Sequence, residues 1–352
     1  MPRGRAIVKT PSQGTLKSIA QELGVSATTV SRVLNGGAKK FRISAKTEAA
    51  VRKLADEMNY SPNQLARGLR LKKTLTIGLI VPEISNPFFG SIARDVAIET
   101  RKRGYSVLLC DSQEDTDSEN RSIETLRSRT VDGLVLCPVG QSADHLRQFE
   151  DGDLPVVLVD RYFSNLHLPY VTSDNFGGAR EATNHLIGNG HRRIACVQGT
   201  RGTSTNDERT CGYKKALEEH RIPWDESLVV GGSFDEQSGY VGAKLLLRRH
   251  KDVSAMFAFS NVILLGVLRA LAEEGRKVPE DISIISFDDQ PYIAQWTPPL
   301  TVVAQRNLEM GQIAVKLLFD WIDSPKHAPR EGVQLPTRLI ARGSVKRRSE
   351  PA

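Results

Sequence analysis

Residues 15–34, TLKSIAQELGVSATTVSRVL, restrict the fold more than any other segment, because two short helical patterns flank a turn at Gly24. The glycine supplies the permissive backbone of a sharp turn, and Ser26 is a natural N-cap for the second helix. Apolar residues recur at helical spacing and predict an inner stripe made by Leu16, Ile19, Ala20, Leu23, Val30, Val33 and Leu34. The segment predicts a helix-turn-helix, which is typical of a DNA-binding protein.

The outer face of the second helix is small and polar, with Ala27, Thr28, Ser31 and Arg32. Short side chains let a helix approach base edges, and a long arginine reaches guanine or phosphate. A helical hairpin buried in a larger core is the alternative, but the polarity of this face argues against it. A third helix, capped by Ser44, is expected to complete a small all-α domain over residues 15–60.

Positive charge is concentrated at this end of the chain. Residues 1–75 hold 15 Lys and Arg against 4 Asp and Glu, whereas the remaining residues hold 33 against 37. A solvated basic face is one interpretation. The concentration of the charge on a helix-turn-helix favours a polyanionic partner, namely double-stranded DNA.

Composition excludes several classes of protein. The four cysteines are scattered and the histidines are not clustered, so we expect no disulfide framework, no metal site and a reducing, cytoplasmic location. No apolar run approaches the ~18 residues of a membrane span, and the first residues lack the apolar core of a signal peptide. The nucleotide-binding and hydrolase motifs GxGxxG after a strand, GxxxxGK[ST], HExxH and GxSxG are absent. We therefore expect neither an enzyme nor a cofactor.

Residues 61–74 follow the helical domain and are rich in Lys and Arg. Pro62 can open a short helix here, although a segment of about nine residues is too short to be stable alone in water. A solvated basic linker is one interpretation. The other is a hinge helix that folds on DNA and inserts an apolar wedge into the minor groove.

From Thr76 onward, short apolar runs alternate with helical patterns, and the alternation restarts after Asp174. This order predicts an α/β fold with two lobes, each built on a doubly wound parallel sheet. We expect residues 75–345 to form this domain, after an N-terminal extension (1–14) and before a tail (346–352). The first lobe is expected over about 75–173 and 302–332, and the second over about 174–301 and 333–345.

Polar side chains follow several of the predicted strands. Asp160 and Arg161 end one strand, Asn261 follows another, and Asp288 ends a third. In parallel sheets, ligands bind beyond the carboxyl ends of the strands, so the cleft between the lobes is the expected site. Local capping by each side chain is the alternative.

Three motifs in this order, VSATTVSRVLNG, NYSPNQLARGLR and TIGLIVPEISNPFF, resemble the lactose repressor (LacI/GalR) family over about residues 15–345. The resemblance implies a two-lobed effector domain of the periplasmic-binding-protein type behind a helix-turn-helix. It also implies the DNA-contacting residues, with Leu69 as the hinge wedge: Thr15, Lys17, Ala27, Thr28, Thr29, Arg32, Asn35, Tyr60, Ala66 and Leu69. The loop NGGAKKFRIS is longer than usual in the family.

The resemblance also implies a set of effector-contacting residues in the cleft: Phe88, Phe89, Asp160, Arg161, Thr203, Thr205, Arg209, Phe234, Asn261 and Asp288. Where the family commonly has Asn-Asp, this chain has Asn261-Val262. Acids, arginines, hydroxyls and an aromatic platform suit a sugar or a sugar acid. The arginines also suit a carboxylate or a phosphate, and the phenylalanines a purine acting as corepressor.

Taken together, these patterns predict a transcriptional repressor of carbohydrate-related genes that is controlled by a small molecule. We expect a homodimer, since two-fold pairing places two recognition helices on a palindromic operator. The helix over 88–103 and the one after Asp111 are the pairing faces that the resemblance implies. A periplasmic-type receptor has the same two lobes, but it should carry a signal peptide and no basic N-terminal domain.

Overall fold

The computed structural model describes residues 15–34, 36–60, 73–325 and 330–348. These residues belong to two compact units, one ending at Thr74 and the other beginning at Leu75. Each unit has its own hydrophobic core. The two units are therefore separate folding domains.

The first unit contains the helices α1 (Leu16–Glu22), α2 (Ala27–Leu34) and α3 (Ala45–Glu57). Thr15 and Ser18 form a capping box at the start of α1, and Gly24 adopts a φ of 61° in the turn. Ser26 Oγ accepts a hydrogen bond from the backbone N–H of Thr29 at 3.0 Å, as expected of an N-cap. Ile19, Val30, Val33 and Val51 are fully buried between the three helices. The predicted helix-turn-helix is confirmed.

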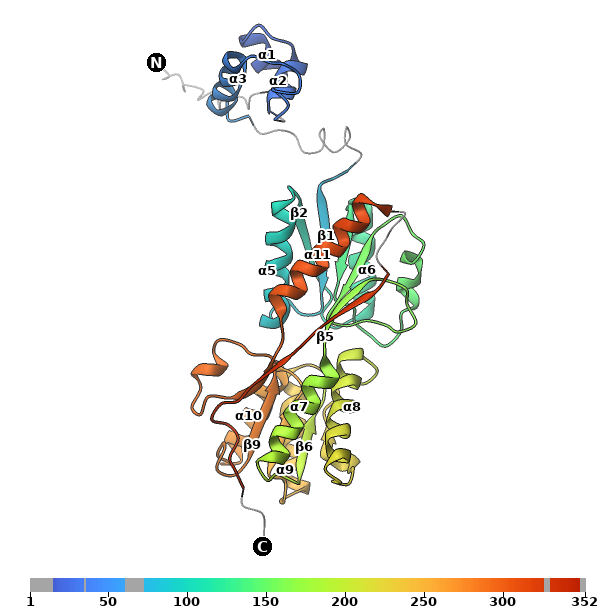
Figure 1. Cartoon of the computed structure of the whole chain (residues 1–352), viewed down its shortest axis with the longest axis vertical. Coiled ribbons are helices and arrows are strands. Elements are labelled where there is room, and N and C mark those ends of the chain that lie inside the picture. The colour runs from blue at the N-terminus through green and yellow to red at the C-terminus, as the bar shows by residue number, and fades with distance from the viewer. Residues whose placement is uncertain (1–14, 35, 61–72, 326–329, 349–352) are drawn as a thin grey trace, which may run out of the picture. The chain divides into compact units, whose positions relative to one another are not determined.

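The first lobe of the second unit is built on a sheet of parallel strands in the order β11-β5-β4-β3-β1-β2. Its strands are β1 (Thr76–Val81), β2 (Ser106–Asp111), β3 (Gly133–Leu136), β4 (Val156–Val159), β5 (Tyr170–Ser173) and β11 (Gly332–Leu335). Its helices are α5 (Pro87–Lys102), α6 (Thr116–Ser128), the 3₁₀ turn η1 (Asp144–Phe149) and α11 (Asn307–Asp323). Helices α5, α6 and α11 lie around this sheet (Figure 1). Successive side chains of β1 point to opposite faces, so Leu79 packs with α5 and α11 while Ile80 packs with α6.

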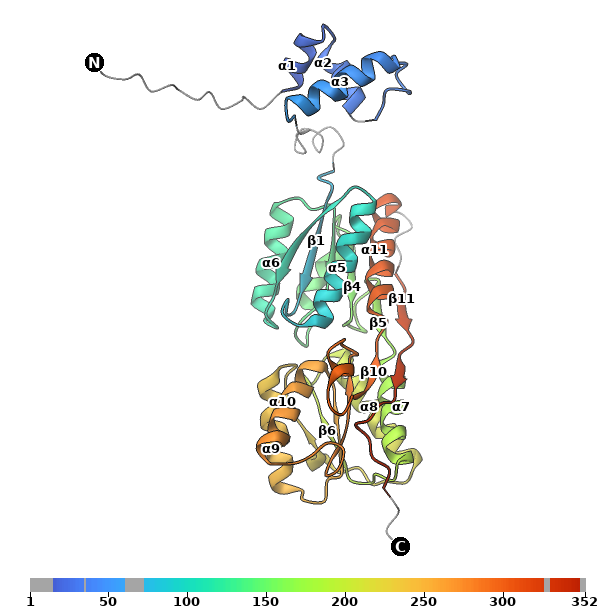
Figure 2. The same ribbon diagram turned by 90° about the vertical axis from the view of Figure 1, so that its left-hand side faces the viewer.

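The second lobe repeats this arrangement with the order β12-β10-β9-β8-β6-β7. Its strands are β6 (Ile194–Val197), β7 (Val229–Val230), β8 (Ala255–Ala258), β9 (Ser283–Phe287), β10 (Thr301–Ala304) and the antiparallel β12 (Arg338–Ile340). Its helices are α7 (Asn175–Gly188), α8 (Ser204–Glu219), α9 (Glu236–Arg249) and α10 (Asn261–Glu273), with the 3₁₀ turns η2 (Glu226–Leu228) and η3 (Ile293–Gln295). Helices α7 and α8 cover one face of the sheet, and α9 and α10 cover the other (Figure 2).

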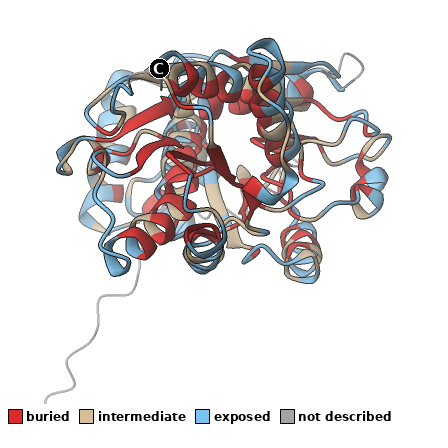
Figure 3. Cartoon of the chain, turned by 90° about the horizontal axis from the view of Figure 1, so that it is seen from below, coloured by how far each residue is buried: buried red, intermediate tan, exposed pale blue. Residues whose placement is uncertain are grey.

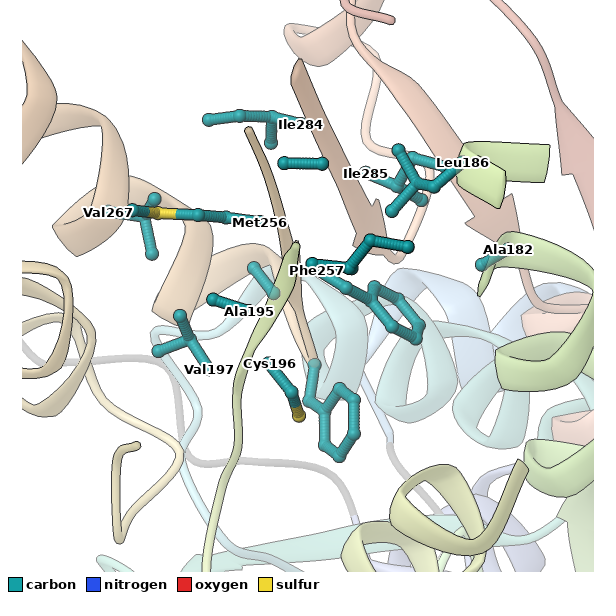
Figure 4. Packing of buried hydrophobic residues seen from close by; sticks show 14 of the residues in the cluster. Ala182, Leu186, Ala195, Cys196, Val197, Met256, Phe257, Val267, Ile284 and Ile285 are labelled. Carbon is teal, nitrogen blue, oxygen red and sulfur yellow. The ribbon is translucent and has the colours of Figure 1, made fainter. Parts of the chain in front are cut away.

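The core of the second lobe fills both faces of its sheet. Met256 faces Val267 of α10, whereas Phe257 lies on the side of Ala182 and Leu186 of α7 (Figure 4). Burial is concentrated on the strands and on the inner sides of the helices, while the outer helical faces are exposed (Figure 3). Strands buried on both faces explain the continuous apolar runs of the sequence.

Among the described residues, the chain passes between the lobes after β5, after β10 and after β11. The expected lobe boundaries near 302 and 332 therefore move a few residues along the chain. Strand β10 pairs with β9 of the second lobe, with Val302 opposite Ser286, and β11 pairs with β5 of the first lobe, with Val333 opposite Val171. The apolar pattern of a strand does not specify which sheet it joins, and this is why the boundaries shifted.

Within the described ranges no helix is both long and apolar enough to cross a membrane. All four cysteines are free, and the described His, Cys, Asp and Glu side chains form no group of three or more that could hold a metal ion.

The close crossing of α9 and α10 gives a test of the packing. A Cβ added at Gly266 would lie 2.0 Å from the backbone oxygen of Glu236, whereas one added at Gly188, the last residue of α7, would meet nothing within 4 Å. We expect Gly266→Ala to destabilise the second unit by about 1–3 kcal/mol, because the helices must separate. Thermal denaturation of the full chain measures this change. Gly188→Ala is the control, and equal melting temperatures for the two variants would contradict the crossing.

Candidate functional site

The outer face of α2 carries the short polar side chains that the sequence predicts. Ala27, Thr28 and Arg32 are exposed, and Thr29 is half-buried with its hydroxyl 2.9 Å from Ser26 Oγ. The apolar side of α2 is buried against α1 and α3. The helix therefore presents one narrow, polar and cationic face to solvent.

The long loop after α2 contacts this face. The exposed ring of Phe41 lies under the guanidinium of Arg32, with 4.0 Å between the Arg32 Cζ and the ring centroid. Lys39, Lys40 and Arg42 in the same loop are exposed, and Arg42 has a φ of 53°. The loop thus adds cations next to the outer face of α2.

The other predicted DNA-contacting residues have several placements. Lys17 is exposed, Thr15 caps α1 with an exposed side chain, and Tyr60 packs partly against the core of the first unit. Asn35, Ala66 and Leu69, together with the segments 1–14, 61–72 and 349–352, lie outside the described residues.

A small cavity of about 20 Å³ lies between the two lobes, at the carboxyl ends of β4 and β9. It has room for about one water molecule. Eight of the ten predicted effector residues line it: Phe88, Phe89, Asp160, Arg161, Thr205, Arg209, Phe234 and Asp288. The rule that ligands bind beyond the carboxyl ends of parallel strands, here called the strand-end rule, therefore identified the position where these side chains converge.

The two acids of the cavity occupy corresponding positions in the two lobes. Asp160 follows β4 with a φ of 68°, and Asp288 follows β9 with a φ of 75°. This left-handed conformation is costly for most residues and most tolerable for Asp and Asn. Burial raises the pKa of Asp160 to about 6, although Arg161 and Arg209 oppose that shift. Burial also raises the pKa of Asp288, against the opposing effect of Arg209.

Arg209 projects from the first turns of α8 into the cavity and is 3% exposed. Its Nε donates to Asn175 Oδ1 at 2.8 Å, its Nη1 donates to the carbonyl of Phe259, and its Cζ lies 3.8 Å from the ring centroid of Phe287. Burial lowers the pKa of Arg209, while Asp288 and Asp160 raise it. The guanidinium is thus held rigidly against an aromatic ring and faces two acids.

Contacts between the lobes close the cavity. Asn261 Nδ2 donates to Asn86 Oδ1 at 3.2 Å, and Gln141 Nε2 donates to the carbonyl of Arg201 at 2.7 Å. A larger chamber of about 1000 Å³ adjoins the cavity and shares Asn86 and Phe234 with it. The two remaining predicted residues, Thr203 and Asn261, line this outer chamber, as does Val262. A ligand larger than water enters the inner cavity only if the lobes or their side chains move apart.

Three residues that sequence reasoning missed also line the inner cavity, namely Asn86, Ser260 and Gln305. Ser260 and Gln305 follow β8 and β10, so the strand-end rule applied to every strand would have found them. Asn86 is the N-cap of α5, directly before Pro87, and its side chain accepts from the backbone N–H of Phe88 at 3.0 Å.

Several polar atoms in this region are buried without a hydrogen-bond partner. They are Thr205 Oγ1, Gln305 Oε1, Arg161 Nε and Asn261 Oδ1. Buried polar atoms are normally satisfied, and those that are not indicate a partner such as water or a ligand. With two acids and two arginines nearby, the cavity can both donate to and accept from a ligand that carries hydroxyl groups.

Two family models match the chain. The model described as bacterial regulatory proteins, lacI family, matches residues 15–63. The model described as periplasmic binding proteins and sugar binding domain of LacI family matches residues 74–342. These two matches coincide closely with the two units of the structure.

Curated proteins and solved structures give the same result over nearly the whole chain. The ribose operon repressor of Halalkalibacterium halodurans is 34% identical over 94% of this chain and 97% of its own length. The repressor PurR of Haemophilus influenzae is 36% identical over 94% and 98%. The lac repressor dimer bound to operator and the anti-inducer ONPF matches with a TM-score of 0.84, 25% identity and coverage of 95% and 100%. A LacI family regulator from Enterococcus faecium with bound ribose matches with a TM-score of 0.69, 31% identity and coverage of 78% and 100%.

The raised pKa of Asp160 predicts a pH-dependent cost to stability. The folded pKa of about 6 lies above the ordinary 3.8, so ionised Asp160 destabilises the fold above pH 6, and the effect vanishes below pH 4. Asp160→Asn should therefore raise the melting temperature more at pH 7 than at pH 4. The control is Asp151→Asn, at an exposed position. An identical effect of Asp160→Asn at both pH values would contradict the assignment.

Proposed function

Because the chain belongs to the LacI family of bacterial regulatory proteins, we propose that it represses carbohydrate-related genes under the control of a sugar bound between its lobes. It is a DNA-binding transcriptional regulator and not an enzyme. The observation that carries the proposal is the convergence of Asp160, Asp288 and Arg209 on one cavity at the ends of β4 and β9.

The charges around the cavity favour a neutral ligand. The guanidinium of Arg161 forms a bidentate pair with Glu114, and Arg209 faces Asp160 and Asp288. Two positive charges are thus opposed by three acids, which leaves no excess positive charge for a carboxylate or a phosphate. Hydroxyl groups donate to carboxylates and accept from guanidinium groups, so a neutral sugar suits this set. Ribose is the specific candidate, because one relative is named a ribose operon repressor and one similar structure contains ribose.

A purine corepressor is the second candidate. The phenylalanines Phe88, Phe89 and Phe234 line the cavity, and aromatic faces can stack on a planar base. A relative named PurR is 36% identical to this chain. The acids at both strand ends favour the sugar, and direct binding measurements with both ligand classes decide between them.

We also propose a homodimer that pairs through α5 and its neighbours. Ile98 on α5, Ile84 just before it and Leu109 on β2 are 38%, 49% and 41% exposed. Strand β2 is an edge strand of the first sheet, and edge strands can pair with another chain. A homodimer carries two α2 helices, as the two half-sites of a palindromic operator require.

Effector binding would act by changing the relative orientation of the lobes. Gln305, on the segment that leaves β10 for the first lobe, lines the cavity, and Asn86 and Asn261 hydrogen-bond across the lobes beside it. A ligand that moves these residues would alter how the lobes meet. A coupling free energy of about 1–3 kcal/mol is typical and would change operator affinity by about 5–150-fold. Whether the sugar strengthens or weakens DNA binding is measured directly by titrating it against an operator complex.

The outer face of α2 predicts different effects for two cations. With the operator selected by the wild-type protein from random duplexes, Arg32→Ala should cost about 1–3 kcal/mol and relax the preference at one base pair. Lys17→Ala, expected to remove a phosphate contact, should weaken all duplexes alike and reduce the salt slope by about one. If Arg32→Ala keeps the wild-type base preference, Arg32 is not a base reader.

Loss of Arg209 should abolish the sugar response and spare DNA binding. D-ribose at 100 times its dissociation constant should stabilise the wild-type chain by about 2.7 kcal/mol in a thermal-shift experiment. Arg209→Met should remove that stabilisation by ribose. If Arg209→Met does not fold, Arg209→Lys is tested in its place, with the same expected result. Lys215→Met, on the exposed side of the same helix, is the control. A normal ribose response in the Arg209 variants would exclude Arg209 from the site.

A further inference from the structure

Arg161 and Glu114 form a bidentate ion pair at the edge of the cavity. Arg161 Nη1 and Nη2 donate to the two carboxylate oxygens of Glu114 at 2.7 and 2.6 Å. The Arg161 side chain is 5% exposed, and that of Glu114 is 33% exposed. Charge-assisted bidentate pairs of this kind fix both distance and orientation.

The backbone that carries Glu114 is strained. Gln113 and Glu114 have φ values of 55° and 53°, in the left-handed region that Gln and Glu seldom occupy. Hydrogen bonds hold this turn, because Glu114 N–H donates to the Pro82 carbonyl at 2.9 Å and Gln113 N–H donates to Asp111 Oδ1 at 3.1 Å. Strain of this kind persists where the surrounding structure requires it, often at ligand sites.

The rest of the Arg161 side chain faces the site. Its Nε lies 3.8 Å from Asp160 Oδ2 and is buried without a hydrogen-bond partner. Its Cζ lies 5.1 Å from the ring centroid of Phe234, which comes from the second lobe. Glu114 accepts one N–H from each terminal nitrogen, and Nε is a donor of Arg161 that has no partner in the structure, so it is available to a ligand.

From this geometry we infer that Glu114 determines the charge class of the ligand. By neutralising Arg161 it makes the cavity select an uncharged sugar and reject the corresponding sugar acid. Removing the carboxylate would leave both terminal nitrogens of the buried Arg161 without an acid partner, with only Asp160 Oδ2 at 3.8 Å from Nε, and a ligand carboxylate could then pair with them. Glu114 lines the outer chamber and acts on the ligand through Arg161, so it is a positioning residue. The inference rests on the proposed function, namely sugar binding at this site.

The test compares D-ribose with D-ribonate by titration calorimetry on the full chain. We expect the wild type to prefer ribose, and we expect Glu114→Gln to shift the ribose-to-ribonate affinity ratio by at least about tenfold, through tighter binding of ribonate. The control is Glu83→Gln, which removes an acid that also lines the outer chamber but hydrogen-bonds to Ser85. This control should keep the wild-type ratio.

An unchanged ribose-to-ribonate affinity ratio in a folded Glu114→Gln protein overturns the inference, but it does not contradict the proposal that the site binds a sugar. If the wild type binds no ribose, the proposed ligand fails, and ribonate binding gained in Glu114→Gln alone would still support the role of Glu114. If neither protein binds either compound, both proposals fall. If Glu114→Gln does not fold, the same titrations are made on Glu114→Asp, whose shorter side chain cannot reach both terminal nitrogens of Arg161. An intermediate ratio then supports the inference, and a wild-type ratio overturns it.

Discussion

Compensation of buried charge between the lobes is the interaction on which the rest of the structure depends. An ionised group is costly to bury unless opposite charge and hydrogen bonds surround it. Here Arg161 is matched by Glu114, and Arg209 by Asp160 and Asp288. Asp160 and Asp288 each adopt a positive φ at the end of a strand, and each N–H bonds to a neighbouring strand, at Val171 and Val303. Both lobes thus use the same local arrangement to hold an acid at the cavity.

This arrangement explains why a DNA-binding protein carries a large second unit. We propose that the cationic helix-turn-helix provides affinity for the phosphate backbone and that its helix α2 selects bases. In this proposal, a ligand that satisfies the buried polar atoms of the interlobe cavity favours one orientation of the lobes over another. A ligand controls DNA binding only to the extent that it binds the two orientations unequally. Asn86 and Asn261 hydrogen-bond across the lobes at 3.2 Å, and we propose that a change of lobe orientation alters this contact.

The features predicted from the sequence were those encoded by local periodicity and by strand ends. The inner and outer faces of α2 and the two sheets, parallel except for β12, followed from apolar spacing, and the Ser26 cap followed from the residue type. Asp160 and Asp288, which end strands, meet at one cavity with Arg209, which the family resemblance had implied. The partner of Arg161 was not predictable, because Glu114 lies 47 positions away on a turn whose positive φ values no local pattern signals. The sheet that β10 joins was also missed, since its apolar side chains suit either lobe. The local sequence pattern does not encode long-range pairing, either of charges or of strands.

The most direct test of the account is a pair of ribose titrations by calorimetry, on the full chain alone and on its complex with the selected operator. Linkage requires that ribose and operator alter each other's affinity by the same factor. We predict that the dissociation constant for ribose differs between the two titrations by about 5–150-fold, and that ribose changes the dissociation constant for operator by an equal factor. Identical ribose affinities in the presence and absence of operator would contradict it, because the cavity would then bind sugar without controlling DNA.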